Sequence, residues 1–206
     1  MTKTKKGILV IISGPAGSGK GTVVAALREM MPEIGFSVSA TTRSPRPGET
    51  DGVNYYYITR EKFEQMIADG EILEHTEYAG NYYGTPVAEV ARRLDAGRDI
   101  ILEIEVEGAA QIKKIYPDAV AVMLIPPDAA TLEARLRGRG TETEEVILRR
   151  LARAREELPL AYNYDYVVVN GDDAVEECAQ TVRGIIEAER NRPFRMKETV
   201  DGFFGE

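Results

Sequence analysis

The sequence predicts an α/β fold of three layers, in which helices cover both faces of a central parallel sheet. Three observations lead to this prediction. Short apolar runs alternate with segments of helical pattern, as in successive strand–helix units. The first apolar run, at residues 7–13, passes through glycines directly into a helix. A polar, turn-rich block at about 37–85 interrupts the alternation, which indicates a subdomain inserted between these units.

The elements expected before residue 86 follow from apolar runs and turn residues. They are strands at 7–13, 36–40 and 55–58, helices at 20–31 and 60–69, and a hairpin at 71–83 around Ala79-Gly80-Asn81. Thr59 is a candidate N-cap for the second helix, and Gly70 is positioned to end it. Helix, hairpin and short strands together predict that the inserted block is a mixed α/β unit.

The rest of the chain returns to alternating strands and helices. Thr85-Pro86 is expected to open a helix, with Pro at its first position and Gly97 beyond its end. Thr141-x-x-Glu144 is a capping-box pattern, which predicts a long helix to about residue 158. The other expected elements are strands at 99–105, 119–125 and 166–170, helices at 108–116, 129–137 and 174–190, and a loosely held tail from 191.

Composition narrows the class of protein. The chain has 206 residues, 43% hydrophobic and 29% charged, which is typical of a soluble globular domain. The net charge of −8 argues against nonspecific nucleic-acid binding. The apolar runs are too short to cross a membrane or to form a signal-peptide core. One cysteine allows no intrachain disulfide, which favours a reducing compartment, so we expect a cytoplasmic protein, monomeric or homo-oligomeric.

Arginines are concentrated within one stretch of this acidic chain. Two interpretations stay open from charge alone: a site for small anionic ligands, or a solvated helix face. The cluster consists of Arg135, Arg137, Arg139, Arg149, Arg150, Arg153 and Arg155.

The strongest motif lies between the first strand and the first helix. It reads Gly14-Pro15-Ala16-Gly17-Ser18-Gly19-Lys20-Gly21-Thr22. Glycines let backbone N–H groups surround an anion, and the positive end of the following helix faces the same phosphates. Lys20 adds a point charge within reach of the β- and γ-phosphates. The motif predicts a phosphate-binding loop, or P-loop, that holds ATP.

The loop departs from the usual pattern at one position. Gly21 stands where a Ser or Thr normally follows the lysine and helps to hold Mg²⁺. Thr22 would substitute, or the ion would be held mostly through water and the nucleotide. The Gly-Lys-Gly-Thr order is similar to the loop of adenylate kinases, which points toward small nucleotide kinases.

From Ser37 onward, the chain resembles guanylate kinases over nearly its whole length. The segment from Phe36 to Glu49, Phe-Ser-Val-Ser-Ala-Thr-Thr-Arg-Ser-Pro-Arg-Pro-Gly-Glu, is similar to their GMP-phosphate segment. Gly80-Asn81-Tyr82-Tyr83-Gly84-Thr85 is similar to their guanine-pocket hairpin, and Arg135-Leu136-Arg137-Gly138-Arg139-Gly140 to their lid. The resemblance implies a P-loop NTPase fold and Mg²⁺-dependent phosphoryl transfer from ATP to GMP.

The resemblance also implies a division of the chain. Residues 1–190 would form one domain, followed by a tail at 191–206. The core would comprise 1–36, 86–125 and 159–190, the GMP-binding subdomain about 37–85, and a helical lid about 126–158.

By the same resemblance, individual residues take roles. Ser39, Arg43, Arg46, Tyr55 and Tyr83 would hold the GMP phosphate, and Glu74 and Thr85 would read guanine. Glu103 and Glu105 would lie near the GMP sugar and the metal, with Thr22 and Glu103 contacting Mg²⁺ through water. Lys20, Arg43, Arg135, Arg139 and Arg150 would act on the transferring phosphates, and Asn170 would lie near adenine. Family members often carry aspartates where this chain has Glu103 and Glu105.

Chemistry agrees with these roles. Two arginines three residues apart can both form bidentate hydrogen bonds with one phosphate. A carboxylate such as Glu74 accepts from both N1–H and the exocyclic amine of guanine, and a hydroxyl such as Thr85 suits O6. The acceptor phosphate has a second pKa of about 6, so it needs no general base. Catalysis would come from alignment and charge stabilisation, with a lid that excludes water.

Two other functions remain open from sequence. One is a peptide-binding module that has the same fold but no catalysis, against which the intact glycines and Lys20 argue. The other is a kinase for a different small phosphate acceptor, such as AMP, a pyrimidine monophosphate or a ribose phosphate. Glu74 and Thr85 argue against that alternative, because adenine would leave the buried carboxylate unpaired.

Overall fold

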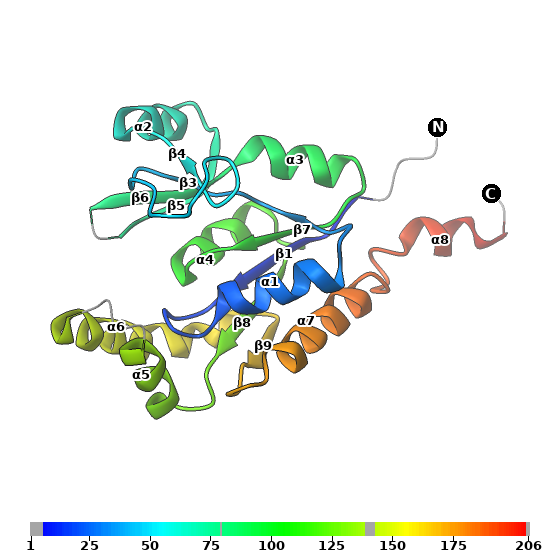
Figure 1. The fold of residues 1–206 in the computed structure, drawn as a ribbon. Coiled ribbons are helices and arrows are strands. Elements are labelled where there is room, and N and C mark those ends of the chain that lie inside the picture. The colour runs from blue at the N-terminus through cyan, green and yellow to red at the C-terminus, as the bar shows by residue number, and fades with distance from the viewer. Residues whose placement is uncertain (1–5, 79, 139–142, 205–206) are drawn as a thin grey trace.

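The fold is a five-stranded parallel sheet with helices on both faces and a second, smaller sheet beside it (Figure 1). The structure, a computed structural model, describes residues 6–78, 80–138 and 143–204. The strand order is β2-β7-β1-β8-β9, and every pairing is parallel. The strands are β1 (Leu9–Ser13), β2 (Gly35–Phe36), β7 (Ile100–Glu103), β8 (Val120–Ile125) and β9 (Tyr166–Val169).

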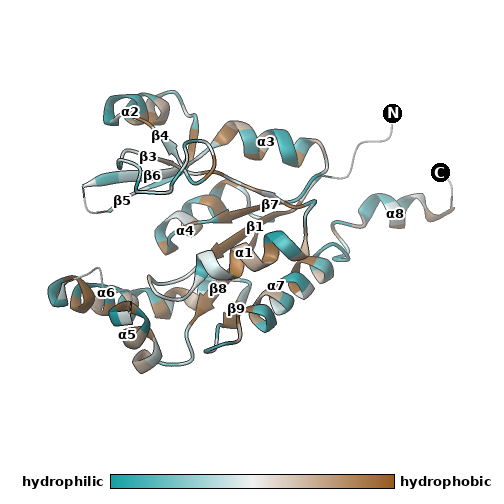
Figure 2. Ribbon diagram, in the orientation of Figure 1, coloured by the Kyte–Doolittle hydropathy of each residue, from teal (hydrophilic) through white to brown (hydrophobic). Residues whose placement is uncertain are grey.

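Each face of the central sheet has its own helices and its own hydrophobic core. Val10 and Ile12 of β1 pack with α1 (Lys20–Met30) and α7 (Val175–Glu189). Leu9 and Ile11 point to the opposite face, against α3 (Val87–Asp95) and α4 (Val106–Ile115). Side chains alternate along a strand, so a run that is apolar at every position fills both cores. The brown central strands in Figure 2 show this, and the predicted three-layer α/β class is confirmed.

The inserted block forms a four-stranded sheet of order β4-β3-β6-β5. Its elements are β3 (Ala40–Thr41), β4 (Tyr56–Tyr57), α2 (Arg60–Ala68), β5 (Ile72–Tyr78) and β6 (Asn81–Pro86). The predicted strand at 36–40 is divided, since Phe36 belongs to the central sheet and Ala40 to the second one. Thr59 caps α2 as predicted, accepting from the backbone N–H of Lys62 at 3.2 Å. Ala79 of the predicted hairpin turn lies outside the described residues.

Buried Phe63 of α2 stacks on Tyr82 of β6, with ring centroids 5.1 Å apart. The helix therefore covers one face of the second sheet and fixes β6, the strand that carries Tyr83 and Thr85.

Two helices, α5 (Ala129–Gly138) and α6 (Glu144–Glu157), lie on the other side of the central sheet's carboxyl end, followed by the 3₁₀ helix η1 (Leu158–Asn163) (Figure 1). Leu132 and Leu136 of α5 pack on Ile147 and Ala154 of α6 in a small separate core. The capping-box prediction was wrong in its register. Thr143 is the N-cap residue, so Glu144 is the first helical residue and not the third; Thr141 lies outside the described residues.

Three further boundaries differ from expectation. Thr85 and Pro86 belong to β6, and α3 begins at Val87, because Pro86 pairs with Ile72 of β5. The helix predicted at 108–116 begins two residues earlier, with Glu105 as its N-cap residue. The tail contains a short helix, α8 (Lys197–Asp201), and a 3₁₀ turn, η2 (Gly202–Phe204). Arg195 anchors the tail, donating to the backbone oxygen of Asp118 at 2.5 Å.

Among the described residues, none of the helices is both long and apolar enough to cross a bilayer. The chain's one cysteine, Cys178 of α7, is 2% exposed and lies in the core beneath α1.

Candidate active site

The glycine loop connects the carboxyl end of β1 to the first residue of α1 at Lys20. Gly14, Gly17 and Gly19 have φ angles of 147°, 93° and 86°, which side chains of L-residues rarely allow. A Cβ at Gly14 would lie 2.1 Å from the backbone oxygen of Leu124, and a Cβ at Gly19 would lie 2.3 Å from Asn170 Nδ2. The loop is therefore pressed against β8 and the end of β9, and only glycine fits at these two positions.

Lys20 turns back over the loop. Its Nζ donates to the backbone oxygen of Gly14 at 2.6 Å and lies 3.6 Å from Glu105 Oε1. The lysine charge is thus held between the loop and the start of α4, at the edge where the parallel strands end. A phosphate in the loop would meet an ammonium group that is already in place.

Asn170, the residue predicted to lie near adenine, follows β9 and lies beneath the loop. The side chain is 2% exposed, and its Nδ2 donates to the backbone oxygen of Ser18 at 2.8 Å. Its Oδ1 has no hydrogen-bond partner among the described residues. Asn170 therefore supports the loop, and its place near adenine stays a prediction.

The residues expected to contact the metal, Thr22 and Glu103, lie in the first turn of α1 and at the end of β7. Thr22 is exposed on the first turn of α1. A Cβ at Gly21 would lie 3.5 Å from Glu103 Oε1, so the carboxylate stands next to the place of the usual hydroxyl. The surrounding walls desolvate Glu103 and raise its pKa; Lys20 opposes this shift and Glu105 adds to it.

Arg43 leads a cluster of polar and aromatic side chains in the second sheet. Its guanidinium forms a bidentate pair with Glu49, with N–O distances of 2.9 and 3.0 Å. Its guanidinium carbon lies 5.4 Å from the ring centroid of Tyr55 and 5.7 Å from that of Tyr57. Tyr83 completes the group, with its ring 6.0 Å from that of Tyr55.

Glu49 holds this loop together. Besides Arg43, it accepts from the backbone N–H of Arg46 at 2.7 Å and from the hydroxyl of Tyr57 at 2.8 Å. The hydrogen bond from Arg43, then that from Arg46, lower the pKa of Glu49 to about 2. Glu49 is therefore ionised at neutral pH, and its carboxylate binds both terminal nitrogens of the Arg43 guanidinium. The Arg46 side chain is exposed nearby, and the backbone oxygen of Ser39 accepts from Tyr56 N at 2.9 Å.

Glu74 of β5 and Thr85 of β6 are 4% and 0% exposed, and the Thr85 hydroxyl donates to Glu74 Oε1 at 2.7 Å. Burial raises the pKa of Glu74 to about 7. The carboxylate also touches α4: a Cβ at Gly108 would lie 2.3 Å from Glu74 Oε2. The two predicted guanine-reading residues are thus adjacent, and Gly108 leaves room for the carboxylate.

The predicted phosphate arginines come from the two helices on the opposite side. Arg135 Nη2 donates to the Asn170 backbone oxygen at 2.9 Å and to Asp172 at 2.8 Å, while its buried Nη1 has no partner among the described residues. Arg150 Nε donates to the hydroxyl of Tyr78, at the end of β5, at 3.0 Å. Arg139 lies outside the described residues.

Three participants were missed from sequence. Tyr57 reads as a plain strand aromatic, yet its hydroxyl holds Glu49. Glu49 was noted only as the last residue of the segment from Phe36 to Glu49. Its position three residues after Arg46 is the spacing of a tight turn, and it could have indicated their contact. Gly108 gave no signal, because its partner Glu74 is distant in the chain.

A parallel sheet, with a glycine loop and a lysine at the junction of its first strand and helix, defines a P-loop phosphate-binding protein. The second sheet, with a buried carboxylate and an arginine–tyrosine cluster, places a polar acceptor site beside that loop.

The chain belongs to the guanylate kinase family, whose model, described as guanylate kinase, matches residues 6–189. A guanylate kinase of Shouchella clausii (strain KSM-K16) is 52% identical over 203 residues, covering 97% of this chain and 98% of that relative. One of Lactococcus lactis subsp. lactis (strain IL1403) is 53% identical over 194 residues, with 94% of each chain covered.

A solved structure leads to the same family. The guanylate kinase from Anaplasma phagocytophilum is 33% identical, with a TM-score of 0.76, and the match covers 93% of this chain and 90% of that one. The resemblance stated from sequence is confirmed. The chain is a nucleoside monophosphate kinase, an ATP:GMP phosphotransferase.

Proposed function

We propose that the residues described above divide the transfer from ATP to GMP into three tasks: reading guanine, holding two phosphate groups in line, and excluding water. The observation that carries this assignment is the buried hydrogen bond between Thr85 and Glu74. A buried carboxylate without a cationic partner is costly, so its presence calls for a ligand with matching donors.

Guanine supplies those donors. Its N1–H and exocyclic amine both donate toward one side, where ionised Glu74 accepts them, and the Thr85 hydroxyl can turn to donate to O6. Adenine presents an acceptor at N1 and would leave the carboxylate unpaired in a buried site. The penalty for that mismatch is the basis of selectivity.

The GMP phosphate would bind at the arginine–tyrosine cluster. Arg43 and Arg46 supply charge, and Ser39, Tyr55 and Tyr83 supply hydroxyl donors. Glu49 keeps Arg43 oriented before the substrate arrives, which lowers the ordering cost of binding. The phosphate oxygen that attacks is already ionised at neutral pH, so no residue has to remove a proton from it.

ATP would lie with its phosphates in the loop Gly14-Pro15-Ala16-Gly17-Ser18-Gly19-Lys20-Gly21-Thr22. Lys20 spreads the charge of the β- and γ-phosphates, and Arg135, Arg139 and Arg150 stabilise the transferring group from the opposite side. Asn170 keeps the loop in shape through Ser18.

The donor set fits Mg²⁺ that is held mainly by the nucleotide. The described residues contain no group of three or more His, Cys, Asp or Glu that could hold a metal alone. Glu103 and Thr22 would contact the ion directly or through water, with Glu105 nearby. When bound, Mg²⁺ neutralises phosphate charge, and its preference for several water ligands suits a site with so few protein oxygens.

We further propose that residues about 126–158 act as a lid and about 37–85 as the GMP-binding subdomain, around a core of 1–36, 86–125 and 159–190. Closure of both over the sheet edge would exclude water and prevent ATP hydrolysis. The enzyme would work in the cytoplasm, where both nucleotides are present.

A substrate panel tests the assignment. The enzyme is incubated with ATP and Mg²⁺ and with GMP, AMP, CMP, UMP or ribose 5-phosphate, and ADP production is coupled to NADH oxidation. We expect turnover with GMP at least a hundredfold above the others. Equal turnover with AMP would remove the role given to Glu74 and Thr85, and no turnover with GMP would refute the assignment as a whole.

The loop lysine has a separate test. Lys20→Ala is expected to lower kcat by two or more orders of magnitude, because the phosphates lose a preorganised charge. Its circular dichroism spectrum should stay that of the wild type. Lys62→Ala on α2, which removes an exposed charge, is the control and should keep its activity. Wild-type turnover in Lys20→Ala would show that the loop does not hold the reacting phosphates.

A further inference from the structure

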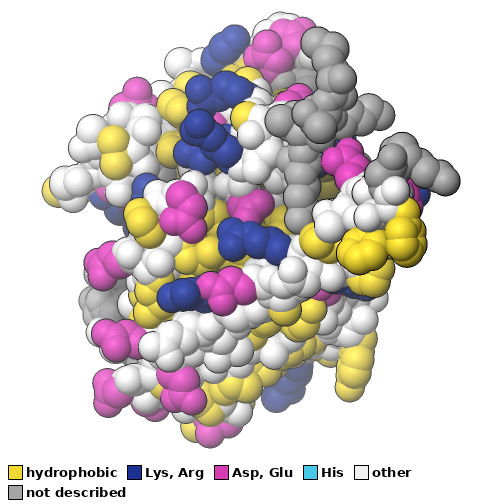
Figure 3. Space-filling view, turned by 90° about the vertical axis from the view of Figure 1, so that its right-hand side faces the viewer, with side chains coloured by type: hydrophobic (Ala, Val, Ile, Leu, Met, Phe, Trp, Pro, Cys, Tyr) yellow, Lys and Arg dark blue, Asp and Glu magenta, His cyan; other side chains and the backbone are white. Residues whose placement is uncertain are grey.

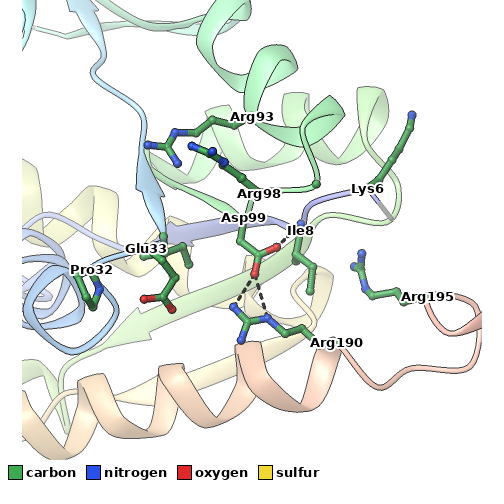
Figure 4. A pocket seen from close by; sticks show the side chains of 11 residues that line it. Lys6, Ile8, Pro32, Glu33, Arg93, Arg98, Asp99, Arg190 and Arg195 are labelled. Carbon is green, nitrogen blue, oxygen red and sulfur yellow. Dashed lines mark hydrogen bonds and ion pairs between the residues drawn. The ribbon is translucent and has the colours of Figure 1, made fainter. Parts of the chain in front are cut away.

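A second cavity lies at the end of the central sheet opposite the phosphate loop (Figure 4). Its volume is about 560 Å³. Its wall includes Ile8, Ile34 and Asp99, the residues that immediately precede β1, β2 and β7. The parallel strands start here and end at the catalytic edge, so this cavity shares no residue with the active site.

The cavity is strongly basic in a chain whose net charge is −8. Five lining residues are cationic and two are acidic. The cationic ones are Lys6, Arg93, Arg98, Arg190 and Arg195, and the acidic ones are Glu33 and Asp99. Figure 3 views this side of the molecule, on which Lys and Arg side chains extend from the top of the face to its middle, with Asp and Glu side chains beside them.

One of the two carboxylates is already used by the fold. Asp99 Oδ2 accepts from Arg190 Nε at 3.0 Å and from Nη2 at 2.6 Å, while Oδ1 accepts from the backbone N–H of Ile8 at 2.7 Å. Asp99 therefore connects α7 to the start of β1, and Arg190 neutralises its negative charge. Glu33 is the other acidic residue of the lining, and two further carboxylates outside the lining, those of Glu89 and Glu189, form ion pairs with Arg93 and Arg195.

Two of the lining cations are buried in part, and the Nε atom of each has no hydrogen-bond acceptor among the described residues. Arg93 Nε lies 3.8 Å from Glu89 Oε1, at ion-pair distance. Arg195 Nε lies 3.9 Å from Glu189 Oε2, and Arg195 Nη2 donates to the backbone oxygen of Asp118 at 2.5 Å. A buried N–H donor without an acceptor is costly, and an oxyanion is the acceptor that guanidinium groups prefer.

Lys6 and Arg98 are exposed at the rim of the cavity. Neither side chain has a hydrogen bond or ion pair within the part of the chain that the structure describes. Arg98 follows α3, which carries Arg93, and the side chains of both arginines point the same way in Figure 4. Lys6 lies just before β1 and extends outward at the rim.

We propose that this cavity is a second ligand site, which binds a small phosphate-bearing anion of nucleotide size. The volume falls within the range of about 300–1,000 Å³ that small-molecule sites occupy. Guanidinium groups bind phosphate oxygens in pairs. The side chains of Lys6 and Arg98, unpaired within the described residues, and the Nε donors of Arg93 and Arg195 that lack acceptors there, suit a ligand with more than one negative charge. A free polyphosphate and the phosphate chain of a nucleotide share this chemistry.

The test separates this site from the catalytic one. The full-length enzyme is first saturated with a bisubstrate analogue that joins adenosine and guanosine through five phosphates. Sodium tripolyphosphate and GTP are then titrated separately by isothermal calorimetry. We expect one further ligand per chain, with an affinity that falls steeply between about 50 and 300 mM NaCl because exposed charges are screened.

Variants assign the binding to the cavity. Lys6→Ala/Arg98→Ala should weaken the second binding event at least tenfold and leave turnover of GMP unchanged, since neither residue belongs to the active site. Lys62→Ala/Lys114→Ala removes the same charge from exposed positions on α2 and α4 and should bind as the wild type does.

No second event with either ligand, or equal weakening in both double variants, would overturn the proposal. If GTP binds more tightly than tripolyphosphate, the site recognises a nucleotide. If the two bind equally, it recognises the phosphate chain alone.

Discussion

If Glu74 reads guanine as proposed, selectivity and stability place opposite demands on its carboxyl group. Its carboxyl group is buried against Thr85 and Gly108, and its pKa of about 7 means that burial disfavours the charged form. Guanine needs that charged form. The ligand-free protein therefore carries at this position a group suited to the complex rather than to the empty fold.

This conflict predicts a pH dependence of GMP binding. With a pKa of about 7, Glu74 is mostly ionised at pH 8 and mostly protonated at pH 6.5, so GMP affinity should fall about fourfold over that range. Calorimetric titration of GMP at several pH values measures it. Glu71→Gln, at an exposed neighbouring position, should leave the dependence intact. A flat affinity over this range would contradict the prediction.

The same group predicts an effect on stability. The folded pKa lies above the ordinary carboxyl value of 4.5, so the folded state binds the proton more tightly than the unfolded one. Stability is then lost as pH rises from about 4.5 to 7, and the full penalty, about 3 kcal/mol, is present above pH 7. Glu74→Gln should raise the free energy of unfolding by that amount at pH 8, but much less at pH 5, while GMP binding is lost. Urea denaturation at both pH values measures it, and a lower stability at pH 8 would contradict it.

Sequence reasoning named candidate site residues more readily than the contacts between them. Resemblance supplied Glu74 and Thr85, and the structure joins them by a hydrogen bond. The contact of Glu74 with Gly108 could not be predicted, because α4 reaches the carboxylate only after the two sheets have packed. The contact of Asn170 with Ser18 could not be predicted for the same reason, since it depends on β9 lying beside β8.

Helix α4 is the element that positions the Glu74 carboxylate, to which we assign the reading of guanine. Its first turn begins after Glu105 and places Gly108 against Glu74 Oε2. The missing side chain at Gly108 is what allows a buried carboxylate to sit between a helix and β5.

Gly108→Ala tests this contact. The added methyl group would lie 2.3 Å from Glu74 Oε2, so the carboxylate has to move, and we expect KM for GMP to rise at least tenfold with little change in KM for ATP. Gly184→Ala, on α7, meets nothing within 4 Å and is the matched control. It should be neutral or stabilise the protein by about 0.5–1 kcal/mol through helix propensity. An unchanged KM for GMP in Gly108→Ala would refute the positioning role.

Some helix boundaries could be predicted from local sequence patterns alone, and others could not. Thr59 and Gly70 mark α2 by capping chemistry that needs no tertiary contact. The start of α3 was misplaced because Pro86 also suits the end of a strand, and pairing of β5 with β6 extends to that residue. Tertiary pairing decided between two locally acceptable conformations.

At the scale of the whole molecule, the active site is an edge where separate parts converge. The second sheet stands on one side of the carboxyl ends of the strands, and α5 and α6 stand on the other (Figure 1). Arg150 of α6 reaches Tyr78 of β5, so the two sides already touch. Arg153 of α6 also lies 3.7 Å from Glu107 of α4.

This arrangement predicts coupled ordering of both sides. Binding of the bisubstrate analogue should slow amide hydrogen exchange in β5–β6 and in α6 together, and raise stability by about 2.7 kcal/mol at a ligand concentration of 100 times Kd. Exchange in α7, which packs against α1 and the central sheet, is the internal control. Protection confined to the glycine loop would contradict the proposed closure.

The burial of Cys178 has a practical consequence for measuring that closure. The only thiol of the chain is 2% exposed in the core, and burial raises its pKa to about 11, so almost none of it is a reactive thiolate at neutral pH. Maleimide dyes placed on new cysteines would therefore label only those positions in the otherwise native enzyme. A donor on α2 and an acceptor on α6 would report the distance between the two walls in single molecules during turnover.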